Sequence, residues 1–162
     1  MTKHVPMEEL EQFKRFVSVS HNVWSILDKW RPFAKDTVGK QFVRAVDSIG
    51  ANLVEGDGRH STKDGLHFFR IARGSARETR YWINCAAARN LIEHSVADQL
   101  IADLIASTKQ LNALIDYRFS KHCAIHVAET AIRTYAALPA ESDDDPFSSP
   151  LWESAYLGVV GP

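Results

Sequence analysis

VGKQFVRAVDSIGANLVEGDGR, residues 38–59, is the stretch of this chain with the plainest helical pattern. Its apolar side chains recur at intervals of three and four residues, at Val38, Phe42, Ala45, Ile49 and Leu53. That period is typical of an amphipathic α-helix and predicts one from an N-cap at Asp36 to about Val54. We expect Gly56-Asp57-Gly58 to end this helix, because glycine tolerates the positive φ of a tight helix exit.

The same period recurs on both sides of this stretch. A first helix is predicted over roughly residues 7–30, ended or kinked by Pro32, which lacks a backbone N–H. Ser61 with Asp64 is a variant of the capping box and is predicted to open a long helix to about residue 92. The residues expected on the inner face of this long helix are Phe68, Ala72, Ser75, Thr79, Trp82 and Ala86.

Two more helical segments are predicted after it. Ser95 with Asp98 should open a fourth helix whose apolar stripe reaches Ile115. No run of period-two alternation predicts a strand. We therefore expect an all-α protein: an antiparallel up-down four-helix bundle over 1–120, an additional short C-terminal helix at 121–138, and a loose acidic tail at 139–162.

The composition fits one globular domain in a reducing compartment. The chain has 162 residues, of which 45% are hydrophobic and 24% charged. No apolar stretch approaches the roughly 20 residues that span a bilayer, and the N-terminus shows no secretory signal. Cys85 and Cys123 lack the spacing of a disulfide framework or a zinc site. We expect a cytoplasmic protein without membrane association.

The formal net charge of −1 hides an asymmetry along the chain. Residues 139–162 hold 5 of the 20 acidic residues and no Lys or Arg, so residues 1–138 carry 15 acids against 19 basic residues. The body is therefore basic, with a net charge of +4, and the tail is acidic.

The third predicted helix concentrates positive charge on one face. At about 100° per residue, the side opposite Ser75 and Thr79 holds a row of cationic groups and no Asp or Glu. Like charges one turn apart repel, and guanidinium groups match phosphate oxygens, so this face favours an anionic partner such as nucleic acid. The predicted nucleic-acid-binding residues are Lys63, His67, Arg70, Arg73, Arg77, Arg80 and Tyr81, with Lys40, Arg44 and Arg59 as an extension of the patch.

Alternatives to nucleic-acid binding stay open at this point. The basic face could be an ordinary solvated surface, or it could pair with acids of another subunit. A protein-interaction module would use it to dock an acidic partner, for which Asp143-Asp144-Asp145 and the aromatic residues that follow are one candidate.

Polar residues inside the predicted stripes indicate structure and not catalysis. The chain holds no Glu-x-x-His pair, no HExxH or GxSxG motif and no Walker loop. We expect no catalytic residues, no cofactor and no metal site. His122, His126 and Glu129 have metal-like spacing, but a solvent-facing polar stripe is the favoured interpretation. A structural network that fixes helix register is predicted for Ser48, Asn52, Glu55, Ser75 and Glu78.

Residues 41–59 and 68–78 together resemble the signature of a known family. The first run carries Arg-Ala, Ser-Ile, Asn, Glu-Gly and a final Arg, and the second resembles Ile-Ala-x-Gly-Ser-x-x-Glu. The family consists of four-helix-bundle proteins, among them those encoded in intervening sequences of bacterial large-subunit (23S) rRNA genes. The resemblance covers about residues 13–119 and implies a four-helix bundle that assembles as a ring-like homopentamer.

The sequence also looks like the accessory proteins of diversity-generating retroelements, which are similar to this family. The resemblance implies a basic protein that binds the RNA of the element and its reverse transcriptase and has no catalytic activity. Phe68, Arg70, Arg73 and Arg77 fall in the relevant block. We therefore expect a non-enzymatic RNA-binding accessory or scaffold protein that acts as a homo-oligomer, with a reverse transcriptase as a candidate partner. The alternative is a protein–protein interaction scaffold of the same family without nucleic-acid binding.

Overall fold

The computed structural model describes residues 5–136, and these residues are helical with no strand. The elements are the 3-10 turn η1 (Met7–Glu9), α1 (Glu11–Leu27), α2 (Pro32–Ala34), the π-helical η2 (Lys35–Gly39), α3 (Lys40–Asp57), α4 (Thr62–Ala88) and α5 (His94–Ala136). The predicted all-α class is confirmed. The predicted tail, residues 139–162, lies outside the described residues.

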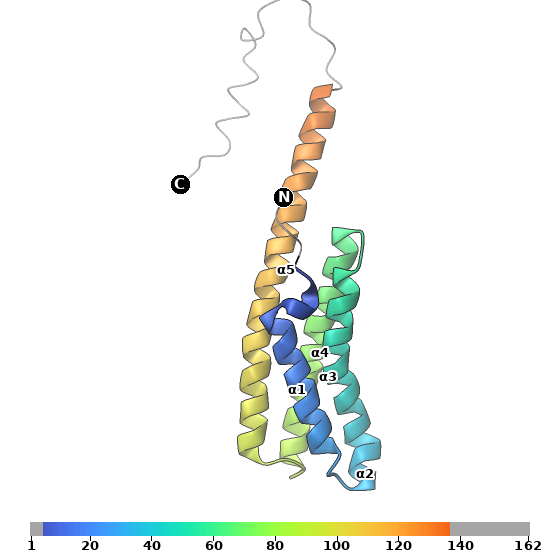
Figure 1. The fold of residues 1–162 in the computed structure, drawn as a ribbon, viewed down its shortest axis with the longest axis vertical. Helices are drawn as coiled ribbons and strands as arrows, with labels where there is room; N and C mark the ends of the chain where they lie inside the picture. Colours follow the sequence, from blue (N-terminus) through green and yellow to red (C-terminus); the bar gives the residue numbers. More distant parts are fainter. Residues whose placement is uncertain (1–4, 137–162) are drawn as a thin grey trace, which may run out of the picture. The chain divides into compact units, whose positions relative to one another are not determined.

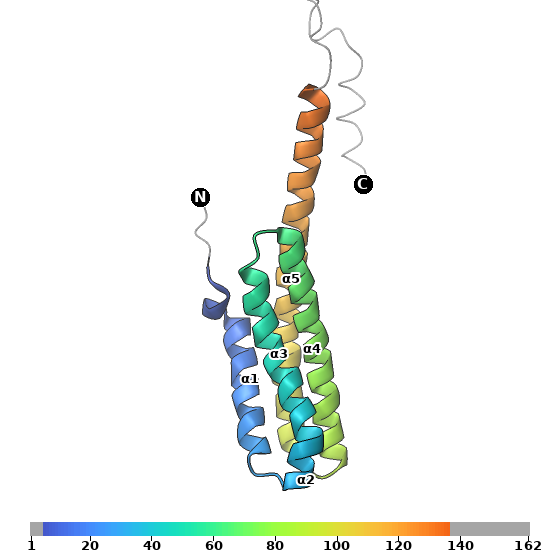
Figure 2. The same ribbon diagram turned by 90° about the vertical axis from the view of Figure 1, so that its right-hand side faces the viewer.

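The chain divides into two compact units, and the boundary between them follows Ile125. The first contains α1 to α4 and α5 as far as Ile125, and these helices lie side by side (Figures 1 and 2). Of the second unit the structure describes only residues 126–136, which are the last turns of α5. Within residues 5–136, no helix combines the length and the apolar character needed to cross a bilayer.

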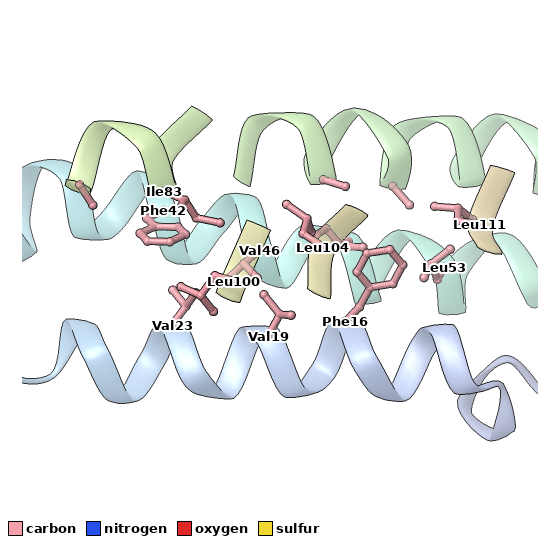
Figure 3. Packing of buried hydrophobic residues seen from close by; sticks show 14 of the residues in the cluster. Phe16, Val19, Val23, Phe42, Val46, Leu53, Ile83, Leu100, Leu104 and Leu111 are labelled. Carbon is pink, nitrogen blue, oxygen red and sulfur yellow. The ribbon is translucent and has the colours of Figure 1, made fainter. Parts of the chain in front are cut away.

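The core of the first unit is made of apolar side chains from every long helix. Figure 3 shows Phe16, Val19 and Val23 of α1 beside residues of α3 and α5. Each such side chain stabilises the fold by roughly 1.5–3 kcal/mol when fully removed from water. The other labelled members are Phe42, Val46 and Leu53 of α3, Ile83 of α4, and Leu100, Leu104 and Leu111 of α5.

The second predicted helix begins earlier than expected. Pro32 does not end or kink α1, which already stops at Leu27, but occupies the first position of α2, where a missing N–H is harmless. Asp36 is therefore no N-cap, because it lies inside η2, one turn into a continuous helical stretch. Its carboxylate instead pairs with Lys40 at 2.9 Å.

Gly56 has a different role from the one expected. It lies inside α3, and no glycine among residues 5–136 has a positive φ. A Cβ at Gly56 would lie 2.7 Å from Phe69 Cε1 and 2.9 Å from the carbonyl oxygen of Gly65. A Cβ at Gly65 would lie 2.7 Å from the carbonyl oxygen of Gly56. The two glycines let the backbones of α3 and α4 touch.

The inner face of α4 is turned slightly from the expected one. Four of the expected residues, Ala72, Ser75, Thr79 and Ala86, are buried, but Phe68 and Trp82 are only half-buried. Leu66, Phe69 and Ile83 take the large core positions instead. The Gly56–Gly65 contact explains the difference, because it places Phe69 and not Phe68 against α3.

Helix starts and lengths also differ from the prediction at two places. The Ser61 cap is present, with its Oγ accepting the Asp64 N–H at 3.4 Å. Ser95 is not a cap, because α5 already begins at His94. The segment 121–138 is not a separate short helix: α5 continues through it without a break as far as Ala136.

Asp57 holds the end of α3 to elements far away in sequence. Its Oδ1 accepts from Arg118 Nη2 of α5 at 2.6 Å, and its Oδ2 accepts the Met7 N–H of η1 at 3.1 Å. The Arg118 guanidinium also lies over the Phe69 ring of α4, 5.1 Å from its centroid. One half-buried carboxylate thus connects α3 with η1 and α5.

The glycine contact predicts opposite effects for two substitutions in α4. Gly65→Ala should destabilise the fold by about 1–3 kcal/mol, because the new methyl group meets backbone that has to shift. Gly74→Ala should stabilise it by about 0.5–1 kcal/mol, because Gly74 is exposed in mid-helix with nothing within 4 Å of its Cβ position. Urea unfolding followed by circular dichroism measures both. Equal stability of the two variants would contradict the close approach of α3 and α4.

Candidate nucleic-acid interface

The outer face of α4 carries the predicted cation row on solvent-accessible side chains. Lys63, His67, Arg70, Arg77 and Arg80 are exposed. Arg73, in the middle of the row, is half-buried. Among residues 5–136, no carboxylate forms an ion pair with any arginine from Arg70 to Arg80. The row therefore keeps its positive charge within the described part of the chain.

The contacts of the row are with neutral groups of α5. Arg73 Nη1 donates to Asn112 Oδ1 at 3.5 Å, a long hydrogen bond. The Arg70 guanidinium lies 5.9 Å from the centroid of the Phe119 ring, at the limit of a cation–π contact. Asp116 lies one turn from Asn112 on α5 and forms no ion pair with the described residues. These contacts hold the arginines in place without neutralising them.

A groove of about 520 Å³ runs between α4 and α5 at the C-terminal half of the row. Its lining includes the buried side chains of Ala76 and Leu104, which form its apolar base. No carboxylate lines it. Its polar lining comes from both helices: Arg77, Arg80, Tyr81 and Asn84 of α4, and Thr108, Lys109 and Asn112 of α5.

Sequence reasoning missed the α5 side of this groove. Lys109 adds a third cation to Arg77 and Arg80, and Asn112 adds an amide that contacts Arg73. The sequence of one helix predicts which of its side chains share a face. Which residues of α4 and α5 lie next to each other depends on how the two helices pack. No pattern in the sequence signalled that Lys109 would lie opposite Arg77.

Tyr81 lines this groove, and its ring contacts the ring of Trp82. The side chain is 57% exposed and makes an edge contact with the Trp82 ring, at 5.0 Å between centroids and 73° between planes. Trp82 Nε1 in turn donates to Glu78 Oε1 at 3.3 Å. A hydrogen bond with the Cys85 thiol, and then the charge of that group, raise the pKa of Tyr81 above its ordinary value.

The three residues expected to extend the patch do not line the groove. Lys40 pairs with Asp36 at 2.9 Å. Arg59 pairs with Glu55 of its own turn and lies over the Phe68 ring, 4.6 Å from its centroid. Arg44 is exposed on α3 and lines a separate hollow with Asp47 and Glu78. The concentrated positive charge is therefore confined to α4 and its α5 neighbour.

The structure joins part of the predicted polar network. Asn52 Nδ2 donates to Ser48 Oγ at 2.9 Å, and Ser75 Oγ donates to the same oxygen at 3.2 Å. This three-residue link connects α3 and α4. Glu55 and Glu78 are not in it, because they are exposed and bond Arg59 and Trp82 instead.

In the described part of the chain, His122, His126 and Glu129 do not form a group that could hold a metal ion, although their spacing resembles that of metal ligands. Within the described range 5–136, His, Cys, Asp and Glu side chains nowhere gather in threes that could hold a metal ion. All three residues belong to α5, where His122 is half-buried and the other two are exposed.

The helices, their packing and the charged face define an all-α bundle protein with a basic surface on one helix. The family model for the 23S rRNA-intervening sequence protein matches residues 8–113. The chain therefore belongs to the 23S rRNA-intervening sequence protein family, as the resemblance indicated.

A solved structure supports the fold. A protein of unknown function from the S23 ribosomal protein family of Bacteroides thetaiotaomicron has a TM-score of 0.58 to this chain at 22% sequence identity. The match covers 64% of this chain and 97% of that one. The comparison with curated proteins gives no match.

The contact with Cys85 predicts how Tyr81 titrates. Cys85→Ala removes both the hydrogen bond and the electrostatic interaction with the Cys85 side chain, so the pKa of Tyr81 should fall toward its ordinary value of about 10. Absorbance titration at 295 nm, compared with the same protein carrying Tyr81→Phe, isolates this phenol. Cys123→Ala is the control, because Cys123 is exposed and belongs to α5, whereas Tyr81 and Cys85 belong to α4. A Tyr81 pKa that is the same in both cysteine variants would contradict the contact.

Proposed function

We propose that this protein is a non-enzymatic RNA-binding accessory or scaffold protein that binds through the α4 cation row and its groove with α5. The observation that carries the proposal is the row itself. Arg70, Arg73, Arg77 and Arg80 recur about once per turn, and no ion pair within residues 5–136 neutralises them.

Physical chemistry supports a polyanion as the ligand of this row. Positive side chains one turn apart repel one another, and that repulsion is relieved when phosphates lie between them. Guanidinium groups form paired hydrogen bonds with phosphate oxygens, and binding releases counterions from the nucleic acid. The contact of Arg73 with Asn112 keeps one guanidinium partly ordered before binding. Less side-chain freedom is then lost when a phosphate arrives.

The resemblance to the accessory proteins of diversity-generating retroelements, which bind the RNA of their element, favours RNA among polyanions. We extend the proposal to a homo-oligomer, a pentamer by resemblance. Symmetry would then repeat the row and strengthen weak single contacts through avidity. A reverse transcriptase of a retroelement is the protein partner that the same resemblance suggests.

The row predicts a steep dependence of RNA binding on salt. Arg70→Ala, Arg73→Ala and Arg77→Ala together should weaken binding at least tenfold near 100 mM salt. They should also reduce the slope of log affinity against log salt by about 2–3. Fluorescence anisotropy of a labelled RNA measures both. The control combines Arg15→Ala, Lys29→Ala and Arg31→Ala, which removes three exposed cations outside α4. No binding at low salt, or equal losses in both variants, would rule out the row as the binding site.

A second candidate function is docking of an acidic protein segment, favoured by the charge asymmetry of the chain. Residues 139–162 hold five acids and no Lys or Arg, whereas the α4 row is cationic. If this segment competes for the row, deletion of residues 139–162 should raise RNA affinity at low salt, and an added peptide of that sequence should lower it again. Unchanged affinity after deletion would argue against such competition.

A further inference from the structure

We infer that the groove between α4 and α5 binds single-stranded RNA, with one base stacked on Tyr81 and the flanking phosphates on Arg77, Arg80 and Lys109. This inference rests on the proposed function and specifies its substrate. The row alone fits any polyanion, whereas the groove has a shape and an aromatic ring that select among them.

The size and the lining of the groove favour a strand whose bases are free. A volume of about 520 Å³ is in the range of pockets that enclose small ligands, roughly 300–1,000 Å³. Its base is apolar, at Ala76 and Leu104, which suits the flat face of a nucleobase. A duplex presents phosphates outward and keeps its bases stacked inside, so it can touch the row but cannot place a base in the groove.

Tyr81 is the stacking platform of this groove. Its ring is 57% exposed, and the edge contact with Trp82 restricts its orientation. A ring that is already ordered loses little freedom on binding. Stacking of one base on an aromatic ring changes affinity by about ten- to a hundredfold.

The remaining polar groups fit a nucleotide and not a bare phosphate. Asn84, Thr108 and Asn112 line the groove as neutral donors and acceptors. Amide and hydroxyl groups of this kind bind base edges and the ribose 2′-hydroxyl. The row continues beyond the groove to Arg73 and Arg70, about one helical turn of roughly 5 Å at a time. That continuation favours a chain of phosphates over a free mononucleotide.

The test compares two RNAs on the full-length chain at low salt. One is a labelled, unstructured 12-nucleotide strand, and the other is a hairpin with the same number of phosphates in a duplex. The strand should bind at least tenfold more tightly. Tyr81→Ala should remove most of this preference, while Tyr81→Phe keeps it because the ring remains. Tyr117→Ala is the matched control, since Tyr117 is 64% exposed on α5 and does not line the groove.

The possible results distinguish a failure of single-strand binding in the groove from a failure of RNA binding by the α4 cation row. Equal affinity for strand and hairpin, unaffected by Tyr81→Ala, overturns the inference and leaves RNA binding by the row intact. Binding of neither RNA overturns both. Competition by uridine monophosphate as effective as that by the strand overturns the single-strand assignment in favour of a mononucleotide site. Circular dichroism of each variant checks that it is folded.

Discussion

The backbone contact between Gly56 and Gly65 is the constraint on which the arrangement of this bundle depends. It brings the backbones of α3 and α4 into direct contact, because a Cβ at either glycine would meet the carbonyl oxygen of the other. It also sets the rotation of α4, because Phe69 then packs against α3. With that face inward, the arginines of α4 lie on the outside. The outward position of the cation row therefore follows from the two glycines, Gly56 and Gly65, at the contact between α3 and α4.

α5 meets the bundle in a different manner. Its contribution to the core consists of large side chains such as Leu100, Leu104 and Leu111. Large side chains hold helix axes further apart than glycine does. On α4, the facing position at Ala76 is small. Ala76 and Leu104 together form the apolar base of the groove that Arg77 and Lys109 line.

Some cations outside α4 are paired with an acid of a neighbouring turn, and among residues 5–136 the α4 arginines are not. Glu11 with Lys14, Asp36 with Lys40, and Glu55 with Arg59 each pair within one helical turn. Exposed pairs of this kind add about 0–1 kcal/mol each, but they keep the local surface near neutral. In the described residues the α4 row has no such partners, although the chain as a whole has nearly equal numbers of acids and bases.

Periodicity located the helices and the charged face, since both are properties of one segment at a time. The cation row and the Ser61 cap could be predicted for that reason. Features that depend on neighbouring helices could not. The sequence predicts a turn at Gly56, because the backbone that excludes a side chain there, at Gly65, belongs to another helix. The position of Lys109 beside the α4 cations likewise depends on how two helices pack. The half-buried position of Phe68 depends on the rotation of α4 against α3, which the pattern of α4 alone does not contain.

The anchor at Asp57 has a consequence for how the chain can be shortened. Its partners, Met7 and Arg118, are 50 and 61 residues away in sequence. The family match ends at residue 113, before Arg118. A fragment trimmed to that match would lack the guanidinium that holds α5 to the end of α3. Trimming the chain at residue 113 would therefore remove both the Arg118–Asp57 ion pair and the contact of the Arg118 guanidinium with the Phe69 ring.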